Sequence, residues 1–427
     1  MNDEPLTAIR RLVDAGDARG AIRELRAHAE TTDPARLAPL MEGVARLSGL
    51  DALAAAAAAL AAEPRGAQEL YAYGYACVEE GASFLAVPAL RAALREAPGS
   101  RGVLVELVAA LEREERHSEV TELLRAREPD LAPWPERYLL AHNALVAGEL
   151  ALARATAARL PRPDGADESW QPAEARLRRM LGRADALAGF SALDDRDLRG
   201  WHHVLTGGLL ATLSPYGFES MTGRWAFLQD SPALCHLGLD RLRLAIEAGG
   251  TAPRAVCALP DRSSRIMALA AARVLGLPLE PYAPDRPDTV VVGYDLGETD
   301  PALLGGLLDR APGQVLYEHA TCWTRPPAVC ADVSGLLAQH CVPFWGEQLR
   351  QDPDGSVGKS AADDRAEQEI ADDVLAADTT PDPGDGGTPP DSDEAFRSFA
   401  ARLAGRPPRG PRERSAPSGP VRSGRFA

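Results

Sequence analysis

Lysine is almost missing from this sequence, and charge of one sign dominates. Lys359 is the single lysine among 46 basic residues, a bias that we attribute to a GC-rich coding sequence. The formal net charge is −16 at neutral pH. An excess of acidic groups repels phosphate backbones and anionic lipid surfaces. We therefore expect neither a nucleic acid nor a membrane as a partner.

Long apolar runs are also absent, and cysteines are few. No run approaches the roughly 20 residues that a membrane-spanning helix needs. The first residues, MNDEPLTAIRR, are acidic and polar, which is not typical of a secretory signal. The six cysteines are scattered, as expected for reduced thiols rather than a disulfide framework. These features favour a cytoplasmic protein.

What is present divides the chain into segments of different composition. A length of 427 residues suggests two or three domains, and 45% hydrophobic residues are enough for globular cores. We expect a multidomain α and α/β protein, in which an N-terminal α-solenoid of helical hairpins precedes a small parallel-sheet α/β domain and a disordered C-terminal tail. The expected boundaries are a helical-repeat domain at 1–160, a linker and helix at 161–200, an aromatic-rich connecting segment at 201–232, the α/β domain at 233–350 and the tail at 351–427.

The alanine-rich first third carries an internal period. Prolines follow apolar helical stretches every 30 to 34 residues or so, at Pro34, Pro64, Pro98, Pro129 and Pro161. In the clearest copy, 70–98, small residues stand where two antiparallel helices must approach closely and a proline ends the second helix: Gly74, Gly81, Ala86, Ala93 and Pro98. This segment resembles a tetratricopeptide repeat.

The resemblance implies a superhelix with a concave face that binds a peptide or another protein. The alternative is that these helices only pack against the next domain of the same chain.

The segment 201–232 concentrates the scarce aromatic residues. One interpretation is an aromatic-walled pocket with histidines as acid/base groups or ligands. Its candidate residues are Trp201, His202, Tyr216, Arg224 and Trp225, with His319 from farther along the chain. The other interpretation is a packing plug between the two domains. We favour the plug, because the adjacent His202 and His203 cannot both lie on one side of a helix.

From residue 234 the pattern alternates between helices and short apolar strands. Strands are expected at 254–259, 279–282, 289–294 and 314–319, separated by helical stretches. Such alternation indicates βαβ units and a parallel sheet, with the loops after the strands at one edge. In open α/β sheets that edge is where ligands bind. We expect the functional cleft there.

Two of these loops carry charged candidates. The stretch TVVVGYDLGETDP, 289–301, joins a buried strand to a helix whose start is marked by Asp300 and Pro301. Its carboxylates, Asp295, Glu298 and Asp300, suit Mg²⁺. The turn after the first strand places Arg262, Ser263, Ser264 and Arg265 at a helix start, where phosphate can bind.

This order of parts resembles the type I phosphoribosyltransferase fold. The resemblance implies binding of phosphoribosyl pyrophosphate with magnesium in the last loop. Asp295 would stand in for that family's pair of acidic residues, but Tyr294 replaces the other acid. Gly297-Glu298-Thr299-Asp300 replaces the phosphate cradle, and its carboxylates repel phosphate unless a cation binds them. We therefore expect a fold that has lost the transferase chemistry.

Two functions follow as hypotheses. The first is a protein-interaction or scaffold protein that binds a protein or peptide through its repeats and has a non-catalytic α/β domain. The alternative is a Mg²⁺-dependent enzyme acting on a phosphorylated or nucleotide-like ligand. No catalytic residue is assigned, although Cys322 with His319 would be a nucleophile and base in a weaker version of the enzyme hypothesis. In the tail, Phe396, Phe399 and Leu403 lie at helical spacing on one side of a short stretch, which we expect to dock in a groove such as that of the chain's own repeats.

Overall fold

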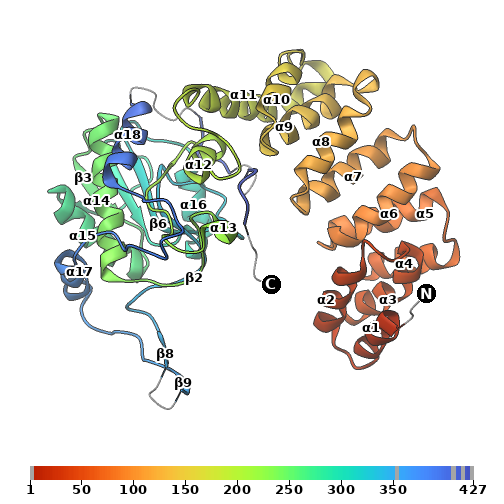
Figure 1. Cartoon of the computed structure of the whole chain (residues 1–427), viewed down its shortest axis with the longest axis horizontal. Coiled ribbons are helices and arrows are strands. Elements are labelled where there is room, and N and C mark those ends of the chain that lie inside the picture. The colour runs from red at the N-terminus through yellow and green to blue at the C-terminus, as the bar shows by residue number, and fades with distance from the viewer. Residues whose placement is uncertain (1–3, 352–354, 405–409, 415–418, 424–427) are drawn as a thin grey trace. The chain divides into compact units, whose positions relative to one another are not determined.

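The protein is described by a computed structural model that covers residues 4–351, 355–404, 410–414 and 419–423. The chain forms two compact units, Met1–Pro172 and Ala173–Ala427. The first is helical and the second is an α/β unit (Figure 1). The expected architecture of α and α/β domains is therefore confirmed, with the boundary a little later than residue 160.

The helical unit is a series of hairpins in which each helix packs against its neighbours in sequence. Proline, glycine and aspartate residues separate the helices, as in the Asp33 cap that precedes Pro34 at the start of α3. The helices are α1 Glu4–Asp14, α2 Ala18–His28, α3 Pro34–Leu47, α4 Asp51–Ala62, α5 Ala67–Glu79, α6 Ser83–Glu96, α7 Arg101–Arg113, α8 His117–Arg125, α9 Tyr138–Val146 and α10 Leu150–Ala157.

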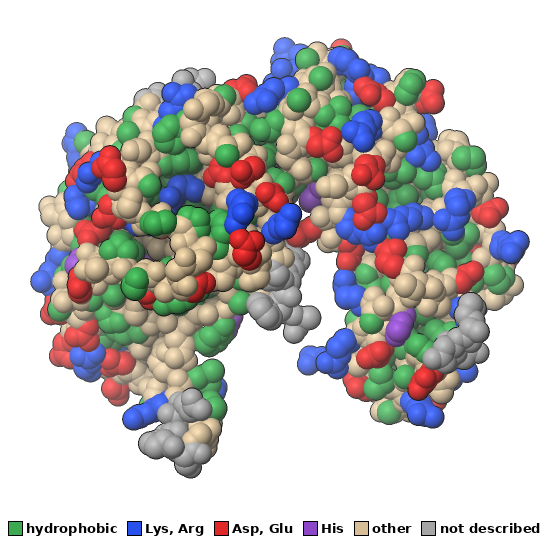
Figure 2. All heavy atoms as spheres, in the orientation of Figure 1, with side chains coloured by type: hydrophobic (Ala, Val, Ile, Leu, Met, Phe, Trp, Pro, Cys, Tyr) green, Lys and Arg blue, Asp and Glu red, His purple; other side chains and the backbone are tan. Residues whose placement is uncertain are grey.

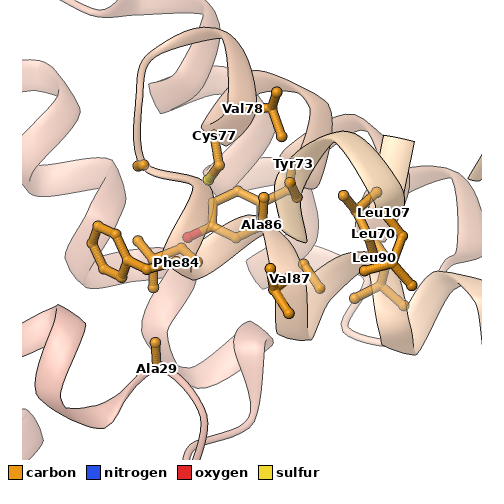
Figure 3. Close-up of a cluster of buried hydrophobic side chains, with 14 of the residues drawn as sticks. Ala29, Leu70, Tyr73, Cys77, Val78, Phe84, Ala86, Val87, Leu90 and Leu107 are labelled. Atoms are coloured by element: carbon orange, nitrogen blue, oxygen red, sulfur yellow. The ribbon is translucent and has the colours of Figure 1, made fainter. Parts of the chain in front are cut away.

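Small residues let α5 and α6 approach closely. A Cβ atom on Gly74 would lie 2.5 Å from Leu90 Cγ, so only glycine fits without displacement of that leucine. Leu70, Leu90 and Leu107, from α5, α6 and α7, lie together in the buried cluster (Figure 3). The spacing that suggested paired helices is thus explained by contact between them.

The α/β unit is built on a parallel sheet. Among the described residues the sheet has seven strands in the order β1-β7-β6-β5-β3-β4, with β2 also paired to β7. The strands are β1 Leu209–Leu210, β2 Trp225–Gln229, β3 Ala255–Ala258, β4 Leu279–Glu280, β5 Thr289–Gly293, β6 Val315–Cys322 and β7 Val333–Val342. All pairings in this sheet are parallel, as the alternating pattern predicted. A separate antiparallel pair, β8 Leu349–Gln351 and β9 Val357–Lys359, forms a hairpin.

Helices cover the sheet. Helices α14 Pro232–Gly249 and α15 Arg262–Leu275 pack on one face and bury a large apolar cluster there (Figure 1). On the other face, Leu307 of α16 Pro301–Leu308 packs with Leu259, Val291 and Leu316. The remaining helices are α11 Gln171–Ala186, α12 Leu198–Thr206, α13 Phe218–Met221, α17 Glu367–Ala376 and α18 Asp393–Arg402, with a 3-10 turn, η4, at Leu296–Glu298.

The aromatic-rich segment 201–232 is part of the sheet and not a connector. It supplies β1 and β2, which pair with the beginning and end of β7 respectively, and α13 lies between them. Trp201 is fully buried and its indole N–H donates to the Asp194 carbonyl. The large rings pack the edge of the α/β unit itself. Sequence reasoning missed this because the two strands are short and interrupted.

The expected disorder beyond Arg350 is wrong for much of the described tail. Helix α17 buries Ile370, Ala371 and Val374 against the α14 and α15 side of the sheet. Helix α18 packs on α14, and its Phe396 is fully buried. This short helix therefore packs on α14 of the α/β unit, and its expected docking in a groove of the repeats is wrong.

The surface carries both signs of charge. Figure 2 shows acidic and basic side chains interleaved over the face in view. Within the described part of the chain, no helix combines the length and apolar character required to span a bilayer.

Candidate functional site

A pocket lies at the carboxyl edge of the sheet, where parallel strands deliver their loops. Its volume is about 330 Å³, within the range of small-ligand sites. Its walls come from the loop after β5 and from the ends of β6 and β7. The polar lining residues are Asp295, Glu298, Cys322, Arg325, Gln339 and His340. The strand-end loop predicted to be functional therefore does border a cavity.

The three carboxylates predicted to bind metal do not converge. Asp295 Oδ1 accepts the Gly297 N–H at 2.8 Å, and Asp300 Oδ1 accepts the Ala302 N–H at 2.7 Å as the cap of α16. Asp295 and Glu298 line the pocket, whereas Asp300 does not. Burial raises the pKa of Asp295, and the nearby Glu298 raises it further. Any cation in this pocket would therefore be held by two carboxylates at most from this set.

The arginine turn predicted to bind phosphate is already occupied. Arg265 pairs with Glu367 of α17 at 2.6 Å, and Arg262 donates to the Arg365 carbonyl at 2.9 Å. Ser264 is buried, and its hydroxyl accepts the Tyr294 N–H. Ser263 accepts from the Trp345 indole at 3.0 Å. These residues hold the tail and the sheet together, so the prediction of an open phosphate site at this turn is wrong.

Asp261 occupies a backbone donor at the start of the helix that follows this turn. Its carboxylate caps α15 by accepting the Ser264 N–H at 2.8 Å. A carboxylate at the N-terminus of a helix excludes a second anion, because both compete for the same backbone donors.

The structure places the aromatic-pocket candidates in different surroundings within the described part of the α/β unit. Trp201 and Arg224 are buried, and the guanidinium carbon of Arg224 lies 5.5 Å from the Trp323 ring centroid. Tyr216 is half exposed and donates to Asp382 at 2.8 Å. Trp225 packs in the apolar cluster on the α14 side of the sheet. The single aromatic-walled pocket envisaged from sequence is therefore wrong.

His202 lies beside a different and much smaller cavity. That cavity measures about 30 Å³, which is room for about one water molecule, and Glu318, Thr321 and Ser334 also line it. His202 Nε2 has no hydrogen-bond partner among the described residues. Burial, with His203 and nearby arginines, lowers the pKa of His202 to about 3, so its ring is neutral. Burial, with Asp295, raises the pKa of Glu318 to about 8.

His319 belongs to a fully buried polar cluster that sequence reasoning did not foresee. Its Nε2 lies 2.9 Å from Asp230 Oδ2, and both side chains are inaccessible to solvent. The Tyr294 hydroxyl donates to the same oxygen at 2.8 Å, and the Cys235 thiol does so at 3.2 Å. Tyr317 contacts the other ring nitrogen of His319 at 3.1 Å. The cluster joins the end of β2, the start of α14 and the centre of β6.

A hydrogen-bonded path links this cluster to the larger pocket. The Tyr294 hydroxyl lies 3.4 Å from the sulfur of Cys341, which lines the pocket. Burial raises the pKa of Cys341, and the negative charge of Asp230 raises it further. The thiol is therefore protonated at neutral pH and is a poor nucleophile.

The geometry does not support Cys322 and His319 as a nucleophile and base. The ring nitrogens of His319 contact Asp230 and Tyr317, and the Cys322 thiol donates to the Gln339 carbonyl at 3.3 Å. The signal that could have identified Asp230 is present in the sequence, since Asp230 directly follows a mostly apolar stretch and precedes the helix start Ser231-Pro232.

The helical unit carries a second candidate surface, on α5 and α7. Tyr71 and Tyr75 lie one helical turn apart with ring centroids separated by 6.3 Å, and Tyr75 is 46% exposed. Two carboxylates are nearby. Burial and the charge of Glu79 raise the pKa of Glu106, and burial, with the charge of Glu106, raises that of Tyr71. Arg113 is 4.0 Å from Glu79. Tyr75 is thus exposed and Tyr71 half-buried, beside two carboxylates whose mutual repulsion Arg113 partly offsets.

Comparison with protein-family models, curated proteins and solved structures found no match to this chain.

Proposed function

We propose that this chain is a protein-interaction or scaffold protein whose tetratricopeptide-like unit binds peptides bearing arginine or lysine side chains. The observation that carries the proposal is the surface formed by Tyr71 and Tyr75 of α5 with Glu79 of α5 and Glu106 of α7. These side chains come from the first helices of two successive hairpins. In repeat proteins of this architecture, adjacent hairpins combine into one extended binding face.

The chemistry of this surface favours a cation. A guanidinium or ammonium group over a tyrosine ring gains about 0.5 to 1 kcal/mol at an exposed site. The same cation relieves the repulsion between Glu79 and Glu106, which adds to burial in raising the pKa of Glu106. A peptide with a negative side chain at that point would increase the repulsion. The surface thus discriminates between basic and acidic peptides.

Binding to fluorescein-labelled decapeptides, followed by anisotropy, tests this proposal. The full chain should bind a peptide containing two arginines and should not bind its glutamate counterpart. Tyr75→Ala should weaken binding about 2- to 5-fold through the lost ring contact. Tyr216→Ala is the matched control, because Tyr216 is 47% exposed but lies in the other unit. Equal affinity for both peptides, or an equal effect of both substitutions, would refute the proposal.

The α/β unit then acts without phosphoribosyl transfer. Support comes from the arginine turn, whose Arg265 is neutralised by Glu367, and from the Asp261 cap of α15. Both contacts use N–H donors that a phosphate would need.

A second candidate function rests on the pocket at the carboxyl edge of the sheet. Because Asp295 and Glu298 both line it, a Mg²⁺-dependent enzyme that acts on a nucleotide-like or phosphorylated ligand is the alternative proposal. Thermal-shift measurements with nucleotides and phosphosugars, with and without Mg²⁺, test it. A Mg²⁺-dependent rise in melting temperature that Glu298→Gln removes would support the enzyme. No shift under any condition would exclude it.

A further inference from the structure

The buried cluster around Asp230 contains three side chains of the kinds that bind transition metals. Asp230 stands after β2, Cys235 in the first turns of α14 and His319 in β6, and all three are fully buried. Each offers one ligand atom, and the three atoms lie within 4.8 Å of one another. The separations are 2.9 Å for oxygen to nitrogen, 3.2 Å for oxygen to sulfur and 3.7 Å for nitrogen to sulfur.

We propose that Asp230, Cys235 and His319 bind a zinc ion. Zinc–ligand bonds of about 2.0 to 2.3 Å at tetrahedral angles place neighbouring ligand atoms about 3.3 to 3.6 Å apart. The three observed separations lie within about 0.5 Å of that geometry. A mixed oxygen, nitrogen and sulfur set selects zinc over magnesium or calcium, which take oxygen ligands.

Hydrogen bonding alone gives one atom of the cluster, Asp230 Oδ2, more donors than it has lone-pair directions. Asp230 Oδ2 has three donors around it, from Tyr294, Cys235 and His319, but a carboxylate oxygen has about two lone-pair directions. If instead His319 carries its proton on Nδ1, then Nε2 and Oδ2 are two acceptors 2.9 Å apart with no proton between them. A cation between the three ligand atoms removes both difficulties.

Charge balance favours a divalent ion. A buried carboxylate and a buried thiolate carry two negative charges, which one zinc ion neutralises while the imidazole remains neutral. The Tyr294 hydroxyl is a further oxygen beside the site, 2.8 Å from Oδ2. Tyr294 also contacts Cys341, which borders the 330 Å³ pocket, so the site lies next to that pocket. This site is separate from Asp295 and Glu298, whose oxygens suit magnesium.

The test is metal analysis of the full chain expressed without a polyhistidine tag. We expect about one zinc ion per chain by mass spectrometry of the metal, and a thiolate-to-metal charge-transfer band when the protein is stripped and reloaded with Co²⁺. Cys235→Ser is the decisive variant. Serine can still donate to Asp230, so a purely hydrogen-bonded cluster should tolerate it, whereas a zinc site loses its thiolate.

In Cys235→Ser the Co²⁺ charge-transfer band should disappear and zinc affinity should fall by ~10-fold or more. Cys257→Ser is the matched control, since Cys257 is equally buried in β3 of the same unit but outside the cluster. His319→Gln, checked for folding by circular dichroism, provides a second ligand variant with the same expected loss of zinc. Wild-type protein that binds no zinc and gives no cobalt band overturns the proposal. So does a Cys235→Ser protein that retains both.

Discussion

At the scale of single residues, buried polar groups are the main determinants of pH behaviour. Glu112 of α7 lies against α9, where Asn143 donates to its Oε1 at 2.7 Å and contacts His117 at 2.8 Å. Burial raises the pKa of Glu112, and the Asn143 bond offsets only part of that effect. The protonated form of this carboxyl group is therefore more favoured in the folded than in the unfolded chain.

Replacing Glu112 with glutamine should therefore stabilise the helical unit at neutral pH. The folded state holds its proton above the unfolded pKa of about 4.5, so the free energy of unfolding falls as pH rises from there through the raised pKa. Glu112→Gln keeps an acceptor for Asn143 and removes that decline. Urea unfolding between pH 4 and pH 8 measures it, with exposed Glu96→Gln as control. A steeper decline in Glu112→Gln than in wild type would contradict this expectation.

At the scale of elements, close approach between helices depends on Gly74. A methyl group there meets Leu90 Cγ at 2.5 Å, and Leu90 is fully buried. Gly74→Ala should destabilise the α5 and α6 hairpin by about 1 to 3 kcal/mol, less the helix propensity gained. Gly102→Ala is the matched control, because nothing lies within 4 Å of its Cβ position in α7. Thermal unfolding measures the stability of both variants. Equal melting temperatures would show that contact with Leu90 does not restrict the side chain at position 74.

The docking of α18 depends on an acidic residue that precedes it. Asp391 pairs with Arg199 at 2.8 Å and with Arg241, whose side chain is 1% exposed. Burial alone would raise the pKa of Asp391, but the two arginines hold it below its usual value. The stability that this group contributes is therefore present at neutral pH and is lost as pH falls through the lowered pKa.

Asp391→Ala should release α18, because Arg241 would be left buried without its main partner, at a cost of about 3 to 5 kcal/mol. Hydrogen exchange should show faster exchange of amides in 393–402, and limited proteolysis should cut there first. Asp393→Ala is the control, since Asp393 is 54% exposed although it also contacts Arg241. Unchanged exchange in Asp391→Ala would contradict the proposed role of this pair.

Local patterns in the sequence predicted some elements well and others badly. Asp300 and Pro301 marked the start of α16, and the valine run 290–292 marked β5. Strand β7 was missed because VSGLLAQHCV mixes glycine and polar residues with apolar ones. Helix α17, EQEIADDVLA, buries only a narrow stripe, so its composition resembles that of an exposed tail.

The site was predictable only where it depends on neighbours in sequence. The loop after β5 does border a pocket, as its strand-end position suggested. That the arginine turn is closed by an ion pair was not predictable, because Glu367, the partner of Arg265, lies about a hundred residues later in the sequence. The Asp230 and His319 pair is separated by 89 residues and depends on β2 and β6, which both pair with β7.

At the scale of the whole molecule, the chain is two units with separate cores. The buried cluster of the repeats draws on residues up to Leu140, and that of the sheet begins at Ala211. We expect fragments 1–172 and 173–427 each to fold when expressed alone. Circular dichroism and cooperative thermal unfolding of each fragment measure this. A fragment that unfolds without a cooperative transition would show that its core is incomplete.

The tail segment that contains Arg412 completes the far face of the sheet. The guanidinium is fully buried, donates to Asp332 Oδ2 at 2.9 Å and to the Leu307 carbonyl, and the Arg412 carbonyl accepts the Cys330 N–H. Asp332 precedes this arginine by 80 residues. During synthesis, a nascent chain that has already emerged through β7 holds Asp332 with Arg310 but without Arg412. The repeat unit can reach its native state on the ribosome early, whereas the sheet unit reaches its own only after Arg412 has been synthesised.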